Sequence, residues 1–209
     1  MNARRLFPLF ALAFLLGCVS ASHNYTPPSV SLLTAPNSKV VDKSKEEVWN
    51  ELVQGLSGQF FVINNMDKSS GFINVSYSGD PERYVDGGEL YFKVSNLAGT
   101  REYKFPAASA NEHYEEIEKG MLLGIDRQLN LEGRMNVVVS EIAPSKTRVT
   151  VHTRYILTLN GSFQSVTGQS GVIPTQTITF DTGGEGRTTA GIVFRSTGKL
   201  EDTALGLVE

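Results

Sequence analysis

The order of apolar and polar residues predicts a folded unit that begins and ends with an amphipathic helix. In residues 44–58, Ser44 and Glu47 fit a capping box, and apolar residues follow at helical spacing. Gly58 predicts a left-handed end to this helix. A second amphipathic segment covers residues 198–208. Both segments need an apolar surface to cover, and the residues between them are expected to supply it.

Between the two helices, apolar and polar residues alternate in several short runs, which is typical of half-buried strands. The predicted strands are residues 60–63, 72–77, 89–95, 135–142, 148–159, 175–182 and 190–194. In the run 148–159 the expected wet face carries Arg148, His152 and Arg154, and the opposite positions are mainly apolar. We therefore expect an α+β fold, in which an antiparallel β-sheet packs against an N-terminal and a C-terminal helix.

Three segments interrupt this pattern. A second capping box opens the acidic stretch 112–119, which predicts a short surface helix. Residues 161–174 are polar and rich in Gly and Ser, so we expect a loop that is either flexible or functional. Residues 77–88, which include Tyr84 and Asp86, form another irregular connection and are expected to rim a surface groove.

The N-terminal residues have the order of a secretory signal. Arg4 and Arg5 are followed by an apolar stretch over residues 6–16, which is too short to span a bilayer permanently. The sequence Leu-Leu-Gly-Cys that ends at Cys18 resembles the lipobox of bacterial lipoproteins. This resemblance implies that residues 1–17 are removed and that Cys18 carries acyl chains, which together would anchor the protein stably. The alternative is a Cys18 that is simply a small buried residue within a longer signal segment.

The next residues indicate where the anchored protein lies. In proteobacterial lipoproteins, an Asp directly after the lipidated Cys favours retention in the inner membrane. This sequence has Val19 at that position. The resemblance therefore implies a location in the outer membrane, facing the periplasm. Residues 18–38 are rich in Ser, Thr and Pro and predict a flexible tether. Alternatively, residues 30–34 pack on the domain as an edge strand. Residues 39–209 are expected to form a single α+β domain.

One part of the sequence carries a resemblance to a known family. A helical Trp49 is followed by an aromatic-led strand at 61–63, an Asp-Lys-Ser-Ser-Gly turn at 67–71 and a strand that ends in Tyr77. This order resembles the start of the helix-grip domain in the C-subunit lipoproteins of the outer-membrane β-barrel assembly machinery (BamC-like). It implies a helix-grip-like fold and, by analogy, a role in an envelope assembly. A second copy of the Trp-helix pattern, which that subunit has, is absent from the sequence.

Composition and charge narrow the classes of partner. The chain has 19 Lys and Arg against 22 Asp and Glu, and its formal net charge is −3. Without a run of basic residues it lacks the electrostatic footprint of nucleic-acid binding, so we expect no nucleic acid as a partner. The sequence has 1 Cys, which excludes a disulfide scaffold and any zinc site built on several Cys residues.

Few residues suggest catalysis or metal binding. His113 and Glu116 form the only local His-carboxylate couple, and we expect a solvated helical pair there rather than a metal site. Ser196 and Lys199 have the Ser-x-x-Lys spacing of penicillin-recognising enzymes, but the companion motifs are absent, so a helix cap is the expected role. We expect no catalytic residues, no metal and no cofactor.

These observations predict a non-catalytic accessory or scaffold lipoprotein of an envelope assembly. Its partners would be the outer-membrane bilayer, through acyl chains on Cys18, and other envelope proteins. The expected contact residues are Arg148, His152, Arg154, Tyr84 and Asp86. Three alternatives remain open: a component of a secretion system or pilus, an envelope hydrolase with Ser196 as nucleophile and Lys199 as base, and a carrier of a small amphiphile between helix and sheet.

Overall fold

The computed structural model describes residues 19–29 and 37–208. In that part of the chain thirteen strands form three antiparallel sheets, and two helices pack beside them. In chain order the elements are β1 (Ser20–Thr26), β2 (Ser38–Val41), α1 (Lys45–Ser57), β3 (Val62–Asp67), β4 (Phe72–Gly79), β5 (Val85–Asp86), β6 (Glu89–Asn96), β7 (Gly99–Pro106), β8 (Asn111–Glu118), β9 (Met121–Ala143), β10 (Lys146–Ser165), β11 (Ser170–Asp181), β12 (Glu185–Arg187), β13 (Val193–Ser196) and α2 (Lys199–Leu205). Cys18 and the alternative edge strand at residues 30–34 lie outside the described residues.

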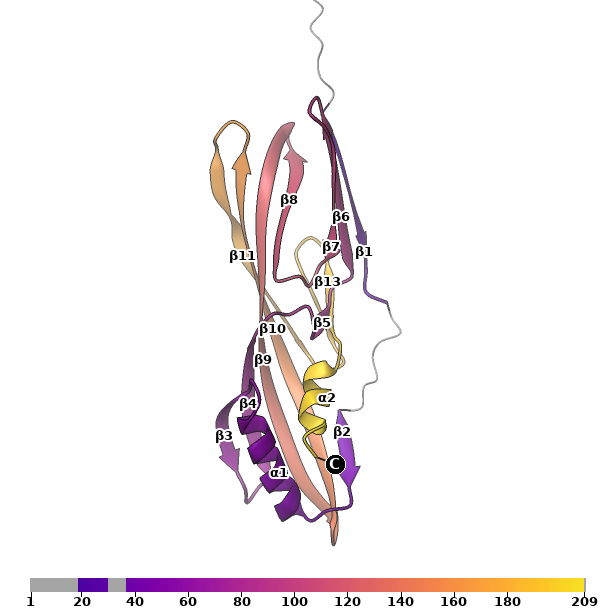
Figure 1. Ribbon diagram of the computed structural model, residues 1–209, viewed down its shortest axis with the longest axis vertical. Coiled ribbons are helices and arrows are strands. Elements are labelled where there is room, and N and C mark those ends of the chain that lie inside the picture. The colour runs from indigo at the N-terminus through magenta and orange to yellow at the C-terminus, as the bar shows by residue number, and fades with distance from the viewer. Residues whose placement is uncertain (1–18, 30–36, 209) are drawn as a thin grey trace, which may run out of the picture.

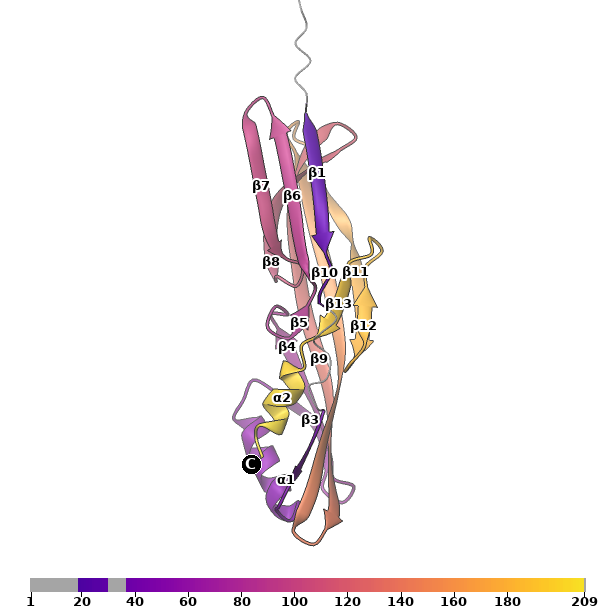
Figure 2. The same cartoon turned by 90° about the vertical axis from the view of Figure 1, so that its right-hand side faces the viewer.

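The hairpin of β9 and β10 runs the whole length of an elongated molecule (Figure 1). At the end near its turn, both helices and strands β2, β3 and β4 pack on or beside it, and we call this end the helical half. At the other end β8 and β11 continue the same sheet, and the separate sheet β1-β6-β7 faces it. We call this second end the sandwich half. The small sheet β12-β13-β5 lies between the two (Figure 2).

The α+β, helix-grip-like fold predicted from the sequence is wrong. The part of the chain that the structure describes is mostly β, with 62% of its residues in strands and 11% in helices. The sequence pattern missed β1, β7 and β8 because their composition is polar, even though β7 and β8 pair with their sequence neighbours through short turns. A second sheet therefore faces the main one where the prediction placed loops and a helix.

The N-terminal helix was predicted correctly. In α1 the Ser44 hydroxyl accepts from the Glu47 amide at 3.3 Å, and the Glu47 carboxylate accepts from the Ser44 amide at 2.9 Å. Gly58 ends the helix, but its φ of −86° is right-handed, so the predicted left-handed end is wrong. The apolar face of α1 is buried in the core through Val48, Trp49, Leu52 and Leu56.

The C-terminal helix is also confirmed, as α2, with Leu200 and Ala204 buried. The residues after α2 return to α1. A Cβ atom at Gly55 would lie 2.9 Å from a methyl group of Leu207, so the glycine permits this close approach. The two helices and the end of the chain thus share one core over the helical half of the sheet.

The hairpin predicted around residues 144–147 is confirmed, but its strands are far longer than predicted. β9 has 23 residues and β10 has 20. In β10, Val149, Val151 and Tyr155 are buried, whereas the alternate side chains point to solvent. The predicted division of this strand into a buried and a wet face is therefore correct in the helical half.

Part of the predicted tether is a strand. β1 pairs with β6 along its whole length, from Ser20 opposite Ser95 to Thr26 opposite Glu89. The prediction of a flexible segment over 18–38 therefore fails for residues 20–26. Their polar composition was misleading because an edge strand gains much of its stability from backbone pairing, which any sequence without proline can provide.

Two further predictions are corrected in the sandwich half. The surface helix predicted over 112–119 is instead β8, which pairs with β9. The capping box at its start is a local signal, and cross-strand pairing outweighs it here. The loop predicted over 161–174 consists of the ends of β10 and β11, with only residues 166–169 between them. The irregular connection predicted over 77–88 contains the short strand β5.

Candidate binding pocket

A pocket of about 370 Å³ lies between the two sheets of the sandwich half. One wall comes from β1 and β6, and the other comes from β8, β9, β10 and β11. The connection between β12 and β13 adds Thr188, Ala190 and Ile192. The remaining lining residues are His23, Tyr25, Leu90, Phe92, Tyr114, Glu116, Ile125, Arg127, Leu159, Asn160, Gly161, Ile173, Pro174 and Gln176. Most of this surface is aliphatic or aromatic.

Aromatic rings form the side of the pocket where the two sheets meet. The rings of Phe92 on β6 and Tyr114 on β8 stack with their centroids 4.2 Å apart. Phe105 on β7 packs against both, and His23 on β1 lies 6.4 Å from Phe92 between ring centroids. Burial raises the pKa of Tyr114, so its hydroxyl stays a neutral donor at physiological pH.

Arg127 brings a charge into this apolar surface. Along β9 the inward positions Leu123, Ile125, Leu129 and Leu131 are all buried, and Arg127 occupies the middle of this row. The Arg127 residue is only 6% exposed. Its cross-strand neighbour on β10 is Gly161, and the side chain of Ile173 lies against this glycine, where an added Cβ would come within 3.0 Å of it. The guanidinium therefore lies at the wall of a pocket whose other lining residues are mainly apolar.

Two backbone carbonyls hold the Arg127 side chain. Its terminal nitrogens donate to the carbonyl of Ser109 at 3.1 Å and to the carbonyl of Ala107 at 2.5 Å. Among the described residues no carboxylate forms an ion pair with it. Burial lowers the pKa of Arg127, yet an arginine side chain stays protonated in proteins. The pocket thus contains a buried cation that forms no ion pair with the described side chains, while the charge of Glu112 acts on it from a longer distance and Glu116 also lines the pocket.

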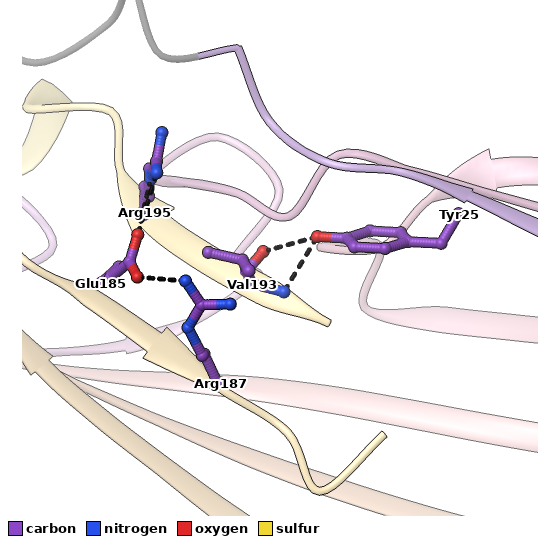
Figure 3. Close-up of polar contacts among 5 residues, drawn as sticks. All are labelled: Tyr25, Glu185, Arg187, Val193 and Arg195. Atoms are coloured by element: carbon purple, nitrogen blue, oxygen red, sulfur yellow. Dashed lines mark hydrogen bonds and ion pairs between the residues drawn. The ribbon is translucent and has the colours of Figure 1, made fainter. Parts of the chain in front are cut away.

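Tyr25 fixes β1 at the pocket wall. Its hydroxyl donates to the carbonyl of Val193 on β13 at 3.2 Å and accepts from the Val193 amide at 2.8 Å (Figure 3). Glu185, Arg187 and Arg195 form ion pairs across β12 and β13 beside this contact. Burial is the main cause that raises the pKa of Tyr25. The N-terminal strand is therefore tied to the small central sheet as well as to β6.

The structure does not assemble a metal centre. Within residues 19–29 and 37–208, no group of three His, Cys, Asp or Glu side chains is placed to hold a metal ion. His113 does not form the predicted helical pair with Glu116, because both lie on a strand. Its partner is Asp126, directly opposite on β9, with 2.7 Å between His113 Nδ1 and Asp126 Oδ1. Both side chains are exposed, and the pair links two strands at the surface.

Three of the predicted contact residues share one exposed face. Arg148, His152 and Arg154 alternate along β10 on the face away from the core, as predicted. Arg154 forms an ion pair with Asp181 on β11 at 3.0 Å, which raises the pKa of Arg154 and lowers that of Asp181. This face lies on the opposite side of the hairpin from Arg127.

The other two predicted contact residues have structural roles. Tyr84 is buried, and its ring lies 4.9 Å from that of Tyr77 between centroids, so it belongs to an aromatic cluster under the loop. Asp86 accepts a hydrogen bond from the Gly88 amide at 2.8 Å and so stabilises a turn. The Tyr84 side chain is therefore not accessible in this structure, and the contacts of Tyr84 and Asp86 with a partner stay predictions.

The Ser196 and Lys199 pair is not arranged as a nucleophile and a base. Ser196 is buried, Lys199 is exposed, and no hydrogen bond joins them within the described part of the chain. Neither residue is the cap of α2, because Gly198 occupies that position with a φ of 76°. The buried acid nearby is Glu201, which accepts from the hydroxyls of Tyr155 at 2.7 Å and Thr182 at 2.6 Å.

Neither helix in the described residues has the length and apolar character needed to cross a membrane. The chain matches no protein-family model, and neither curated proteins nor solved structures gave a significant match.

Sequence reasoning missed Arg127, although a signal for it exists. Residues 123–131 alternate strictly, with apolar residues at every second position except 127. A charge at an apolar position of such a strand marks either a buried polar contact or a binding site. The run was not assigned as a strand because its polar neighbours and Gly124 weaken the local β signal.

Proposed function

We propose that this protein is a lipid-anchored protein of the cell envelope that binds a small amphiphile with an anionic head group in the pocket of the sandwich half. The observation that carries the proposal is the buried Arg127, which lines a mainly apolar pocket and forms no ion pair with the described side chains. Glu116 is the one carboxylate among the lining residues. A buried charge is costly unless an opposite charge or several hydrogen bonds compensate it. A ligand carboxylate or phosphate would accept hydrogen bonds from the Arg127 guanidinium and supply a negative charge, in addition to the two carbonyls that already accept from it.

The shape and chemistry of the pocket support an amphiphile rather than a purely polar ligand. Its volume of about 370 Å³ is at the lower end of the range of small-molecule sites, about 300 to 1,000 Å³. Phe92, Leu159 and Ile173 would contact an acyl or other apolar chain, and Arg127 would bind the head group. The sequence left open a carrier that holds an amphiphile between a helix and the sheet. The pocket lies between two sheets instead, so we propose binding there.

The expected membrane anchor would place this pocket close to a source of amphiphiles. His23 lines the pocket and follows Cys18 by five residues, a distance of about 17 Å along an extended strand. Lipidation of Cys18 and a location at the periplasmic face of the outer membrane remain proposals that rest on the lipobox resemblance. The proposed role is binding and involves no catalytic step.

A photoactivatable fatty acid tests the proposal in membranes that contain the full-length chain. A diazirine-bearing acid and the matching neutral alcohol are crosslinked in parallel, and the labelled peptides are identified by mass spectrometry. We expect the acid to label peptides of β9, β10 and β11 at least about tenfold more strongly than the alcohol, since hydrogen bonds to a charged group contribute about 1.5 to 3 kcal/mol. Arg127→Gln should reduce the labelling by the acid to that of the alcohol.

Two further variants separate binding from folding. Ile173→Trp fills the pocket while keeping Arg127, and it should lower labelling by both probes. Arg154→Gln replaces an exposed arginine on the outer face of the same sheet and should change neither. Thermal unfolding of each variant shows whether it folds. Equal labelling by acid and alcohol in the wild type, or wild-type labelling that Ile173→Trp leaves intact, would contradict the proposal.

A second candidate function is the accessory role in an envelope assembly, and the free edge of β3 favours it. β3 pairs only with β4 in the described structure, and its side chains Val62 and Met66 are exposed. An exposed edge strand can accept a strand from another protein. A photocrosslinker at Val62, compared with one at His152 on the outer face of β10, tests this contact in intact cells.

The proteins captured from position 62 decide which assembly is involved. Subunits of the β-barrel assembly machinery would support the accessory role implied by the resemblance, and components of a secretion system or pilus would move the role there. Absence of any envelope protein at position 62 would contradict the edge-strand contact. Capture at position 152 alone would favour a partner contact through the exposed face of β10 that carries Arg148, His152 and Arg154.

A further inference from the structure

The most exposed large apolar side chains in the described residues lie at one end of the molecule. Leu97 is 89% exposed, Val172 is 79% exposed and Val166 is 74% exposed. Leu97 lies in the turn between β6 and β7, Val166 lies in the turn between β10 and β11, and Val172 follows closely in β11. Both turns are at the far end of the sandwich half, opposite the turn of the β9–β10 hairpin (Figures 1 and 2).

The N-terminal part of the chain joins the fold at this same end. Ser20 pairs with Ser95, just before the β6–β7 turn, and Val19 beside it is itself exposed. The residues that precede Val19 include Cys18 and the apolar stretch over residues 6–16. Either a lipidated Cys18 or that apolar stretch would hold this end at a membrane surface. The exposed side chains of two separate turns therefore lie where the anchor leaves the fold.

The exposure of these three apolar side chains contributes nothing to the core of the protein. Exposed leucine and valine residues are common singly, but here three of them, from two different sheets, lie at the same end of the molecule. The ion pair between Arg101 on β7 and Glu115 on β8 joins the sheet that carries the β6–β7 turn to the main sheet. Aliphatic side chains presented on rigid turns can enter the interface of a bilayer, because transfer from water is favourable for each of them.

We infer that the end of the sandwich half formed by Leu97, Val166 and Val172 contacts the surface of a lipid bilayer, with these side chains inserted into its interface. The inference rests on the anchor in the proposed function and goes beyond it, since it orients the protein. β10 spans about 60 Å, so the helical half and the free edge of β3 would then stand away from the membrane. The pocket would lie between the bilayer and the central sheet.

A fluorescent probe at each end of the protein tests the orientation. The full-length chain is produced with Leu97→Cys, Val166→Cys or, as the matched control at the opposite end, Ile142→Cys, which replaces another exposed apolar residue. Each variant is labelled with an environment-sensitive dye and bound to vesicles of phosphatidylethanolamine and phosphatidylglycerol that carry a nitroxide lipid. A lipidated Cys18 has no free thiol, so the wild type should take no label.

We expect quenching at positions 97 and 166 to be several-fold stronger than at position 142. Flotation of the vesicles reports the anchor independently. If the chain floats but no probe is quenched, the contact is overturned while the anchor stands. If the chain does not float, both the anchor and the contact fail. Leu97→Ser combined with Val166→Ser should leave thermal stability and flotation unchanged, because the acyl chains hold the protein on the vesicle, and should lower the nitroxide quenching of a dye at Val172→Cys several-fold. Unchanged quenching in this variant would also overturn the inference.

Discussion

The two ends of the β9–β10 hairpin bury their inner faces in different ways. In the helical half, two helices cover the sheet and the inward row of β9 contains Met135, Val137 and Val139, all buried. In the sandwich half, a second sheet covers the same two strands, and the row contains Arg127 opposite Gly161. Large side chains of the helices fill one half, whereas in the other half a pocket of about 370 Å³ remains beside Arg127. The same strands therefore supply a packed core at one end and a pocket at the other.

This difference predicts that stability and ligand binding reside in separate halves. Close-packed cores lose several kcal/mol when a large side chain is truncated, whereas the wall of a pocket already lacks contacts on one side. Variants in the helical half should therefore alter the free energy of unfolding. Variants in the pocket should alter binding at nearly constant stability.

The largest effect is expected from Leu52→Ala in α1. Leu52 is fully buried, and its truncation should lower the free energy of unfolding by about 2 to 5 kcal/mol. Ile173→Ala on the pocket wall is the matched variant and should lower it by less than about 1 kcal/mol, because Ile173 is only partly buried. Urea unfolding followed by circular dichroism measures both. Similar losses at the two sites would show that the pocket is packed as tightly as the core.

A smaller loss is expected from Glu201→Ala, which breaks the buried polar contacts of α2. Tyr155 and Thr182 would lose their acceptor, at a cost of about 2 kcal/mol. Burial and the adjacent Glu201 raise the pKa of Tyr155, so its hydroxyl remains a donor throughout the accessible pH range. A double-mutant cycle with Tyr155→Phe isolates the contact between the two side chains. A coupling energy near zero would mean that each group finds water instead.

The effect of Tyr25→Phe should be about 1 kcal/mol and confined to the sandwich half. Both hydrogen bonds between the Tyr25 hydroxyl and Val193 would be lost, and β1 would be held by β6 alone. Hydrogen exchange should become faster in residues 20–26 and stay unchanged in α1. Faster exchange across the whole chain would show that β1 is part of the global folding unit rather than a locally stabilised strand.

The helical half was also the half that could be predicted from the sequence. The capping box at Ser44, the helical spacing through Leu56 and the turn at 67–71 are local signals, and each segment adopts the structure that its own residues favour. The alternation in 148–159 predicted which side of β10 is buried because one side faces a helix-covered core and the other faces water.

The sandwich half was predicted only in part. Strand β6 and the second half of β11 match the predicted runs 89–95 and 175–182, whereas β1, β7 and β8 were missed because their composition is polar. The acidic residues of 112–119 alternate with few apolar ones, and only the pairing of β8 with β9 shows that they form a strand. Residues 161–174 have the composition of a loop. Their first part, at the end of β10, pairs with β9 on one side and with the start of β11 on the other. A pocket formed between two such sheets has no sequence motif, and its only local trace is the arginine at an apolar position.

The smallest predicted effect is a pH dependence in the turn between β3 and β4. Asp67 accepts hydrogen bonds from the Ser69 hydroxyl at 2.6 Å, the Ser70 hydroxyl at 2.8 Å and the Ser69 amide at 2.9 Å, and these bonds lower its pKa from 3.8 to about 2. Because the folded pKa is below the unfolded value, the stabilisation is present above about pH 4 and is lost as the pH falls toward 2. Asp67→Asn should therefore lower the melting temperature slightly at neutral pH and make its decline between pH 4 and pH 2 less steep. Asp80→Asn, in the connection after β4, where the carboxylate accepts one amide bond from Glu82, is the control. Identical pH profiles for Asp67→Asn and the wild type would show that this exposed turn contributes nothing to folding, and the helical half would then depend on its core alone.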